Sequence, residues 1–173
     1  IMKKNHVHIM KMGGTIEFKD PGYEIMNQQM MKLDTSIENY LKNMVKPHFT
    51  YSIENICDKD SRDIGQKDLE KLIKAVTLTP HENILITHGT FTMKATAKYL
   101  DEKISKNSTS NMKIILTGSM IPIVGFSVSD AAFNLGYSIG SFNNIPKGVF
   151  ICMNGGIFNY KDVEKNTELL RFE

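Results

Sequence analysis

Residues 83–93 read Asn-Ile-Leu-Ile-Thr-His-Gly-Thr-Phe-Thr-Met. The three aliphatic residues near the start of this stretch are typical of a strand that is buried on both faces of a sheet. Gly89 permits a sharp turn, and the residues from Thr90 to Lys103 predict a helix. A strand that ends where a helix begins presents free backbone N–H groups and the positive end of a helix dipole, which suits a carboxylate or a developing oxyanion. The simpler interpretation of this stretch alone is that Thr90 or Thr92 caps the helix.

Strands and helices are predicted to alternate along the rest of the chain. Further strands are expected at residues 6–12, 49–56, 113–117 and 147–153, and further helices at 35–44, 66–77 and 131–139. This order predicts a single α/β domain over residues 1–173 with a doubly wound, mainly parallel sheet and helices on both faces, as in Rossmann-like and flavodoxin-like folds.

Local signals refine this plan at three places. Thr35-Ser36-Ile37-Glu38 has the composition of a capping box and predicts a helix start. The polar stretch 17–32, which contains Tyr23, predicts a surface loop that could move. Gly136 and Gly140 lie in a predicted helix, where we expect them to permit close packing rather than to carry function.

Polar side chains follow each predicted strand at the point where the strand ends. They are Thr15, Ser61, Thr90, Ser119 and Asn154. Ligands of doubly wound sheets bind beyond the carboxyl ends of the strands, near the point where the strand order reverses. Four hydroxyl groups and one amide at a single edge of the sheet therefore predict a site for a small polar ligand.

The bulk composition excludes several classes of protein. The chain has 173 residues with 41% hydrophobic and 23% charged residues, which is ordinary for a soluble globular domain. Its net charge of +2 gives no reason to expect binding to nucleic acid or to an anionic membrane. The cysteines Cys57 and Cys152 have no metal or redox spacing and fit a reducing compartment. No apolar run reaches the length of a membrane span or a signal peptide, so we expect a cytoplasmic protein.

The residue types allow hydroxyl chemistry but do not select its activating group. A threonine or serine nucleophile needs a base or a nearby cation, and Lys165 is only one of many lysines that could serve. A serine-hydrolase elbow, a phosphate loop and a dinucleotide fingerprint are all absent from the sequence. His6 and His8 could share one strand face, but isolated structural histidines are commoner than metal ligands, and no metal or other cofactor is expected. His88 lies beside Gly89 and could equally be a buried, hydrogen-bonded residue.

Five blocks of the sequence resemble the bacterial-type L-asparaginase family in order and spacing. They are Met12-Gly13-Gly14-Thr15-Ile16, Ser61-Arg62-Asp63, His88-Gly89-Thr90-Phe91-Thr92-Met93, Leu116-Thr117-Gly118-Ser119-Met120 and Val163-Glu164-Lys165-Asn166. The resemblance covers the whole chain but only the N-terminal domain of that family, so we expect the family's C-terminal domain to be absent. It implies hydrolysis of asparagine, and often glutamine, to the acid and ammonia through a covalent acyl-threonine.

The resemblance also implies roles for individual residues. Thr15 corresponds to the nucleophile, and Tyr23 is a candidate for the mobile-loop tyrosine that activates it. Thr90 and Lys165 would form a second hydroxyl–lysine pair, in which the lysine polarises the hydroxyl groups or accepts a proton. Ser61 would bind the α-carboxylate of the substrate.

Further substrate contacts are expected from the turns around these residues. Backbone N–H groups at Gly89 and Thr90 could stabilise the oxyanion, and Ser119 is the remaining hydroxyl candidate for substrate binding.

Two substitutions and the missing domain depart from the family pattern. Phe91 replaces the usual aspartate that pairs with the substrate ammonium, and Arg62 replaces a frequent glutamine. We expect Arg62 to act as a fixed cation that repels an ammonium and attracts a carboxylate. An unpaired ammonium in a closed site costs about 1–3 kcal/mol, which lowers affinity tenfold or more.

Several functions therefore remain open at this stage. The first is an asparaginase-type amidohydrolase with asparagine as the default substrate. The second is a binding or sensing domain that has lost turnover, and the third is an amidohydrolase for a carboxylate-bearing amide without an α-amine. A phospho-receiver or flavodoxin-like carrier shares the architecture but lacks its acidic cluster or phosphate loop. The resemblance further implies assembly as a homodimer.

Overall fold

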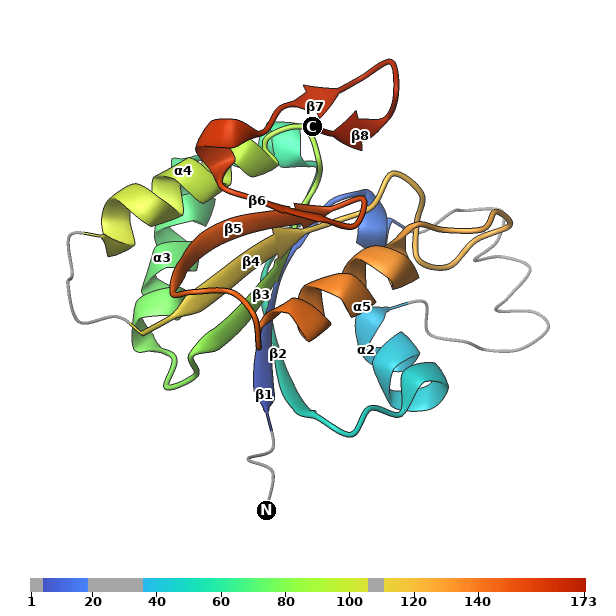
Figure 1. Ribbon diagram of the computed structural model, residues 1–173, viewed down its shortest axis with the longest axis horizontal. Coiled ribbons are helices and arrows are strands. Elements are labelled where there is room, and N and C mark those ends of the chain that lie inside the picture. Colours follow the sequence, from blue (N-terminus) through green and yellow to red (C-terminus); the bar gives the residue numbers. More distant parts are fainter. Residues whose placement is uncertain (1–4, 19–35, 106–110) are drawn as a thin grey trace.

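The computed structural model describes residues 5–18, 36–105 and 111–173. Six of the strands in these residues form one sheet (Figure 1). In spatial order they are β2 (Thr50–Lys59), β1 (His6–Gly13), β3 (Asn83–Thr87), β4 (Lys113–Thr117), β5 (Gly148–Met153) and β6 (Gly156–Phe158). The first five are parallel, and β6 returns antiparallel to β5. The predicted doubly wound α/β fold is thereby confirmed.

Helices cover both faces of this sheet (Figure 1). One face carries α3 (Gln66–Leu78) and α4 (Met93–Ile104). The other carries α5 (Ala131–Ser141) and α2 (Ile37–Asn39), which continues into the π-helical segment η2 (Tyr40–Val45). A short 3₁₀ turn follows each of β1, β2 and β6; these turns are η1 (Thr15–Glu17), η3 (Ser61–Asp63) and η4 (Tyr160–Asp162). The last strands, β7 (Lys165–Asn166) and β8 (Arg171–Phe172), form a two-stranded antiparallel ribbon.

The central strand β3 is buried on both faces, as its aliphatic run predicts. Ile84 and Ile86 join the core beneath α3 and α4, whereas Leu85 joins the core beneath α2 and α5. All three side chains are fully shielded from solvent. Because successive residues of a strand point to opposite faces, only a strand covered on both sides can keep an uninterrupted apolar run.

Several predicted boundaries differ from the structure. The helix at α2 is capped by Ser36, whose hydroxyl accepts a hydrogen bond from Asn39 N at 3.2 Å, rather than by Thr35. Thr35 and most of the predicted loop at 17–32 lie outside the described residues. Strand β2 continues through Cys57 to Lys59 because β1 bulges near its end and Gly13 pairs with Lys59.

The close packing expected at two glycines of α5 is wrong. A Cβ atom added to Gly136 or Gly140 would meet no heavy atom within 4 Å. Both residues instead line an apolar hollow of about 320 Å³ between α5 and η2. The sequence identifies a small residue but not whether another element fills the space beside it.

Candidate active site

The strand order reverses between β1 and β3, and the proposed site lies at their carboxyl ends. From β1 the chain passes to β2 on one side of β1, and it then crosses to β3 on the other side. Such a reversal leaves a crevice at the carboxyl edge of the sheet. Thr15 begins the turn after β1, and Thr90 lies in the turn after β3.

Because glycine has no side chain, two glycines allow these turns to pack directly against one another. Gly14 has a φ of +85°, and a Cβ atom at this position would lie 2.4 Å from Gly89 N. A Cβ atom at Gly89 would in turn lie 2.7 Å from Ser61 Oγ. Neither position has room for a side chain, so the turns that carry Thr15, Ser61 and Thr90 are in direct contact.

The turn after β4 joins the same edge. A Cβ atom at Gly118 would lie 2.3 Å from the carbonyl oxygen of His88, so the Ser119 turn packs on the β3 turn. The fifth residue, Asn154, supports the structure instead. Its side-chain oxygen accepts a hydrogen bond from Phe172 N at 3.0 Å and ties the C-terminal ribbon to β5.

Lys165 lies against Thr90, although 75 positions separate the two residues in the chain. Lys165 Nζ donates a hydrogen bond of 2.7 Å to Thr90 Oγ1, and the Thr90 hydroxyl faces Met120 Sδ at 3.9 Å. Partial burial of Lys165, and secondarily the positive charge of Arg62, lower the pKa of Lys165 below its ordinary value. The amine can therefore exist in its neutral form more readily than an exposed lysine.

Phe91 lies between two cations at the mouth of the site. Its ring centroid is 3.9 Å from Lys165 Nζ and 4.7 Å from Arg62 Cζ, while 58% of the residue is exposed. An aromatic face attracts cations through its quadrupole. Phe91 thus holds the ammonium of Lys165 on the site side and covers it from solvent.

Asp60 compensates the charge of Arg62, which the sequence predicts as a fixed cation without a partner. Its Nε and Nη2 atoms donate to the two carboxylate oxygens of Asp60 at 2.9 and 2.8 Å. Hydrogen bonds from the Arg62 side chain, and then from its backbone N–H, lower the pKa of Asp60 to about 2. Asp60 stays ionised at neutral pH, so the Asp60–Arg62 pair has no net charge.

The two serines of the proposed site are nearly buried. Ser61 is 2% exposed, its hydroxyl oxygen lies 3.4 Å from Thr92 N, and its carbonyl oxygen accepts a 2.7 Å hydrogen bond from the Thr92 hydroxyl. Thr92 precedes the first residue of α4, but its hydroxyl makes no capping bond. Thr92 therefore occupies the N-cap position of α4, as the simpler interpretation allowed, but it caps the helix without its side chain. Ser119 donates its hydroxyl hydrogen to the carbonyl of Ile121.

Asp130 positions the Ser119 turn, a role that the sequence did not reveal. Its carboxylate accepts hydrogen bonds from Met120 N at 3.0 and 2.9 Å and from Ile121 N at 3.0 Å. The sequence marks this aspartate as a helix start, but its side chain makes no capping bond within α5. Asn134, one turn further on, donates to the carbonyl of Gly118 at 3.0 Å.

A buried ion pair stabilises the turn that carries Thr15. Lys11 Nζ lies 3.0 Å from Glu17 Oε1, and the exposed fractions of the two side chains are 19% and 8%. Burial raises the pKa of Glu17 above its ordinary value, although Lys11 opposes this shift. Glu17 shares the single turn η1 with Thr15, so the pair fixes the turn to β1.

His88 is the buried, hydrogen-bonded residue that one interpretation of the sequence allowed. Its Nδ1 lies 2.7 Å from the carbonyl oxygen of Gly89, which can only accept, so Nδ1 carries the proton. Nε2 then accepts from the Thr96 hydroxyl at 2.8 Å. Burial lowers the pKa of His88 to about 4, which keeps the ring neutral.

The remaining candidate residues have a less complete description. Thr15 is half-buried in η1, and Tyr23 lies outside the described residues. Within the parts of the chain that the structure describes, no group of three or more His, Cys, Asp or Glu side chains is arranged to hold a metal ion.

One family of known proteins matches almost the whole chain. The family described as "Asparaginase, N-terminal" matches residues 6–169. The glutaminase-asparaginase of Acinetobacter glutaminasificans is 32% identical over 119 residues, which are 67% of this chain and 33% of the relative. A probable periplasmic L-asparaginase of Haemophilus influenzae is 26% identical over 172 residues, which are 94% of this chain and 46% of the relative.

Solved structures of similar fold cover nearly the whole chain. A probable cytoplasmic L-asparaginase from Campylobacter jejuni superposes with a TM-score of 0.75 at 24% identity, over 98% of this chain and 51% of the other. L-asparaginase I from Vibrio cholerae gives a TM-score of 0.76 at 23% identity, over 99% and 51%. The chain spans about half the length of these structures, and one third to one half of the sequence relatives.

Proposed function

The chain belongs to the asparaginase family, and we propose that it hydrolyses a side-chain amide to the carboxylic acid and ammonia through an acyl-threonine. The observation that carries this proposal is the 2.7 Å hydrogen bond from Lys165 Nζ to Thr90 Oγ1. The turn of Thr90 lies in contact with the turn of Thr15 through Gly14 and Gly89. A nucleophile therefore has a hydroxyl–lysine pair beside it.

The reaction has two halves with Thr15 as the nucleophile. In the first, Thr15 Oγ1 forms a bond to the amide carbon, and its proton passes towards the Thr90–Lys165 pair. The C–N bond then breaks, and the nitrogen takes a proton and leaves as ammonia. In the second half, water attacks the acyl-threonine, releases the acid and restores the Thr15 hydroxyl.

The lowered pKa of Lys165 supports its role as the proton acceptor. Backbone N–H groups at Gly89 and Thr90 are the proposed donors to the oxyanion. Tyr23 is proposed, from the family resemblance alone, as the residue that activates Thr15.

Asparagine is the proposed default substrate, because the relatives named above are asparaginases or glutaminase-asparaginases. Phe91 favours a second candidate, an amide that bears a carboxylate but no α-amine. The aspartate that the family places at this position is replaced by an aromatic ring, and the nearby Asp60 is already paired with Arg62. Ser61 is the proposed contact for the substrate carboxylate in either case.

Ammonia release from asparagine, glutamine and succinamate, which is asparagine without its α-amine, tests this proposal. We expect release with at least one of the three, and we expect Thr15→Ala to abolish it. Thr77→Ala, on the exposed side of α3, is the matched control and should retain full activity. Release from succinamate above that from asparagine would select the second candidate. A folded protein that binds these amides without releasing ammonia from any of them would overturn the amidohydrolase proposal in favour of a binding domain.

A homodimer in the cytoplasm is proposed as the working state. No helix in the described residues is long and apolar enough to cross a membrane, and Cys57 and Cys152 are both free thiols. Light scattering at micromolar concentration should give twice the 19.6 kDa mass of the chain. A monomer mass would exclude the dimer.

A further inference from the structure

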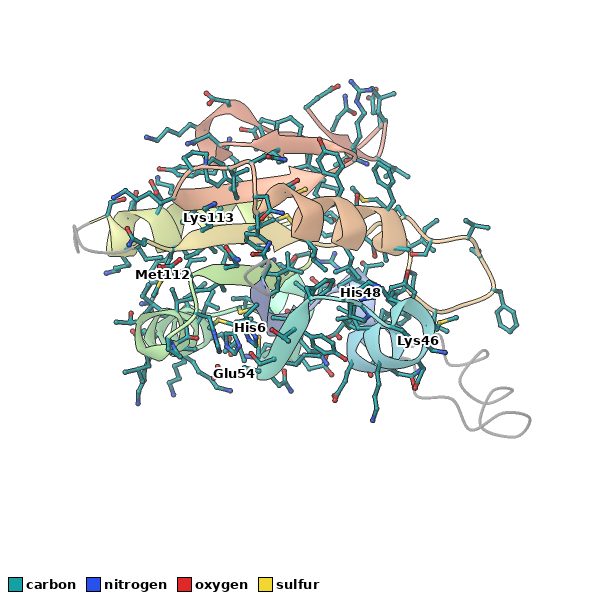
Figure 2. All side chains as sticks on the ribbon, turned by 60° about the horizontal axis from the view of Figure 1, so that its bottom comes forward. His6, Lys46, His48, Glu54, Met112 and Lys113 are labelled. Carbon is teal, nitrogen blue, oxygen red and sulfur yellow. The ribbon has the colours of Figure 1, made fainter. Side chains whose placement is uncertain are left out.

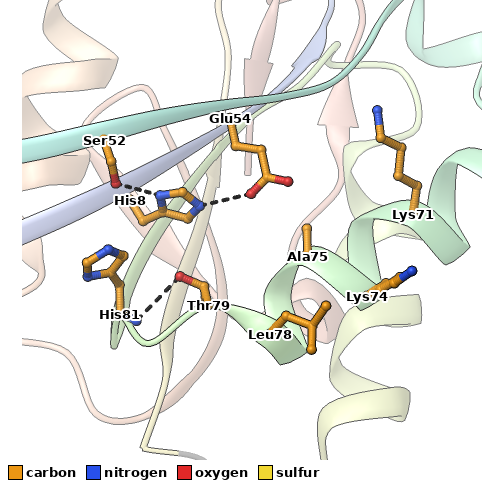
Figure 3. Close-up of a pocket in the computed structure, with 9 residues that line it drawn as sticks. All are labelled: His8, Ser52, Glu54, Lys71, Lys74, Ala75, Leu78, Thr79 and His81. Atoms are coloured by element: carbon orange, nitrogen blue, oxygen red, sulfur yellow. Dashed lines mark hydrogen bonds and ion pairs between the residues drawn. The ribbon is translucent and has the colours of Figure 1, made fainter.

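A second hollow lies at the opposite end of the strands that form the candidate active site. It has a volume of about 530 Å³ and lies between α3 and the amino-terminal halves of β1 and β2 (Figure 3). Ala75 and Leu78 of α3 form its apolar wall. The opposite wall is polar and contains His8 and His81, and we call this hollow the histidine pocket.

Side chains of two neighbouring strands form a continuous row of hydrogen bonds along the polar wall. His6 lies 3.0 Å from the Thr50 hydroxyl and 2.9 Å from the Ser52 hydroxyl. Ser52 Oγ also lies 2.7 Å from His8 Nδ1, and His8 Nε2 lies 3.2 Å from Glu54 Oε2 (Figure 3). Alternate residues of β1 and β2 point to the same face, which aligns these five side chains.

His81, from the loop between α3 and β3, adds a third imidazole to this group. Its ring stacks on His6 with centroids 3.9 Å apart and lies 5.4 Å from the ring of His8. Its backbone N–H is 3.4 Å from the Thr79 hydroxyl, but no hydrogen bond joins either ring nitrogen to another residue in the described parts of the chain. The ring nitrogens of His81 are therefore available to a ligand, while the ring face is held by His6.

The charges around the pocket favour an anionic ligand. Glu54 is the one carboxylate in the lining, and it already pairs with His8. Lys71 and Lys74 of α3 add two positive charges, and Lys71 Nζ is fixed by the carbonyl oxygens of Asn55 and Ile56. Protonation of the histidines adds further positive charge without any additional carboxylate.

Burial and the neighbouring rings both resist protonation of His6. Burial is the main cause that lowers the pKa of His6, and the nearby His81 and His8 lower it further. A bound anion would offset the repulsion between the imidazolium groups and favour their charged forms. Anion binding and proton uptake are therefore linked, and each promotes the other.

We propose that the histidine pocket is a binding site for a small, multiply charged oxyanion of the sulfate, phosphate or dicarboxylate class, which His81 holds through its ring nitrogens. A cation site fits less well, because lysines flank the pocket and the described residues contain no arrangement of ligands for a metal ion. The volume exceeds what a tetrahedral oxyanion needs and also accommodates a four-carbon dicarboxylate. The proposal does not depend on the amidohydrolase function.

Calorimetric titration of the whole chain with sulfate at pH 6.0 and pH 8.0 tests the site, because sulfate keeps its double charge throughout this range. We expect binding at least tenfold tighter at the lower pH, with proton uptake detected by comparing two buffers of different ionisation enthalpy. Succinate at pH 6.5 distinguishes a dicarboxylate preference from a preference for tetrahedral anions. Sodium chloride at equal ionic strength should not compete. Equal affinity at both pH values, or complete competition by chloride, would overturn the proposal.

Two histidine variants identify the location of binding. His81→Asn should weaken sulfate binding at pH 6.0 by about tenfold and reduce proton uptake, and its fold should persist because the ring makes no protein hydrogen bond. His48→Asn is the matched control, since His48 is exposed next to η2, away from His6 and Glu54 (Figure 2).

Nuclear magnetic resonance of the five histidines supplies an independent readout. Sulfate should shift the ring signals of His6, His8 and His81 but not those of His48 or His88. An equal loss of affinity in the two variants, or shifts confined to His48, would place the anion elsewhere and overturn the site.

Discussion

The two ends of the same strands are built by different means. At the carboxyl ends, glycines bring the turns of Thr15, Ser61 and Thr90 into direct contact. At the amino ends, side-chain hydrogen bonds that include ionisable imidazoles line an open hollow. The first construction fixes the distances among the turns, whereas the second contains groups that can respond to pH. Substitutions should therefore have separable effects at the two ends.

The largest effect is expected for Lys165→Met. Loss of the amine removes the proton acceptor beside Thr90 and should reduce the kcat/KM of amide hydrolysis about a thousandfold. Lys161→Met, at an exposed lysine of η4, is the control and should change activity less than twofold. Sulfate binding at the other end of the sheet should be the same in both variants. A Lys165→Met protein with ordinary activity would remove the basis of the proposed mechanism.

Gly14→Ala should cause the next largest change, this time in stability. The residue has a positive φ, and its new Cβ would overlap the backbone of Gly89, so we expect the free energy of unfolding to fall by about 3 kcal/mol or more. Gly136→Ala is a matched control on an open part of α5 and should raise it by about 0.5–1 kcal/mol. Denaturant titration measures both. A tolerated Gly14→Ala would show that the turns can separate.

The sequence predicts the elements that local pattern determines and misses contacts made over long distances. Strand β4 matches its predicted bounds, and β3 contains the predicted aliphatic run, because both are buried aliphatic segments. Helix α4 begins at Met93 rather than at Thr90, because the hydroxyl of Thr92 binds Ser61 in another turn instead of capping. No local pattern distinguishes those two uses of a hydroxyl.

The same limit applies to the candidate site. The convergence of Thr15, Ser61 and Thr90 follows from strand topology, so the sequence could predict it. The choice of Lys165 came only from family resemblance, because its contact with Thr90 depends on how the C-terminal ribbon folds back. The neutralisation of Arg62 by Asp60 was missed even though the two residues are only two positions apart.

His88 should give the carboxyl end a pH-dependent stability. Its pKa in the folded protein is about 4, against 6.5 when unfolded, so the folded form resists protonation. Stability is fully present above pH 6.5 and should fall by up to about 3 kcal/mol as the pH drops to 4. Unfolding measured between these limits should show a flatter profile for His88→Gln than for His48→Gln. Identical profiles for the two variants would assign the effect to other groups.

Arg62→Gln should produce a smaller effect, visible in the pH profile of activity. Arg62 contributes to the lowered pKa of Lys165, so its removal raises that pKa. If the neutral amine accepts the proton, the rising limb of kcat/KM against pH should then move to higher pH. Lys98→Gln, on the exposed side of α4, should leave the limb unchanged. A limb that stays in place in Arg62→Gln would show that Lys165 does not control it.

The smallest effect is expected for Ser52→Ala at the amino end. Its hydroxyl lies between His6 and His8, and its loss should cost about 1 kcal/mol of stability without altering ammonia release. Ser127→Ala, at an exposed position in the loop between β4 and α5, is the stability control. A large loss of ammonia release in Ser52→Ala would show that the two ends of the sheet are coupled.

The row of side chains beside the histidine pocket has a direction. With Glu54 ionised and both rings neutral, His8 Nε2–H donates to Glu54, and Ser52 donates to His8. His6 Nε2–H then donates to Ser52, and Thr50 donates to His6. Supplying one proton at Thr50, with Glu54 ending protonated, reverses every bond and switches both tautomers while all heavy atoms stay in place. Two electrically distinct states would therefore share one set of atomic positions, and nitrogen chemical shifts would tell them apart where X-ray coordinates could not.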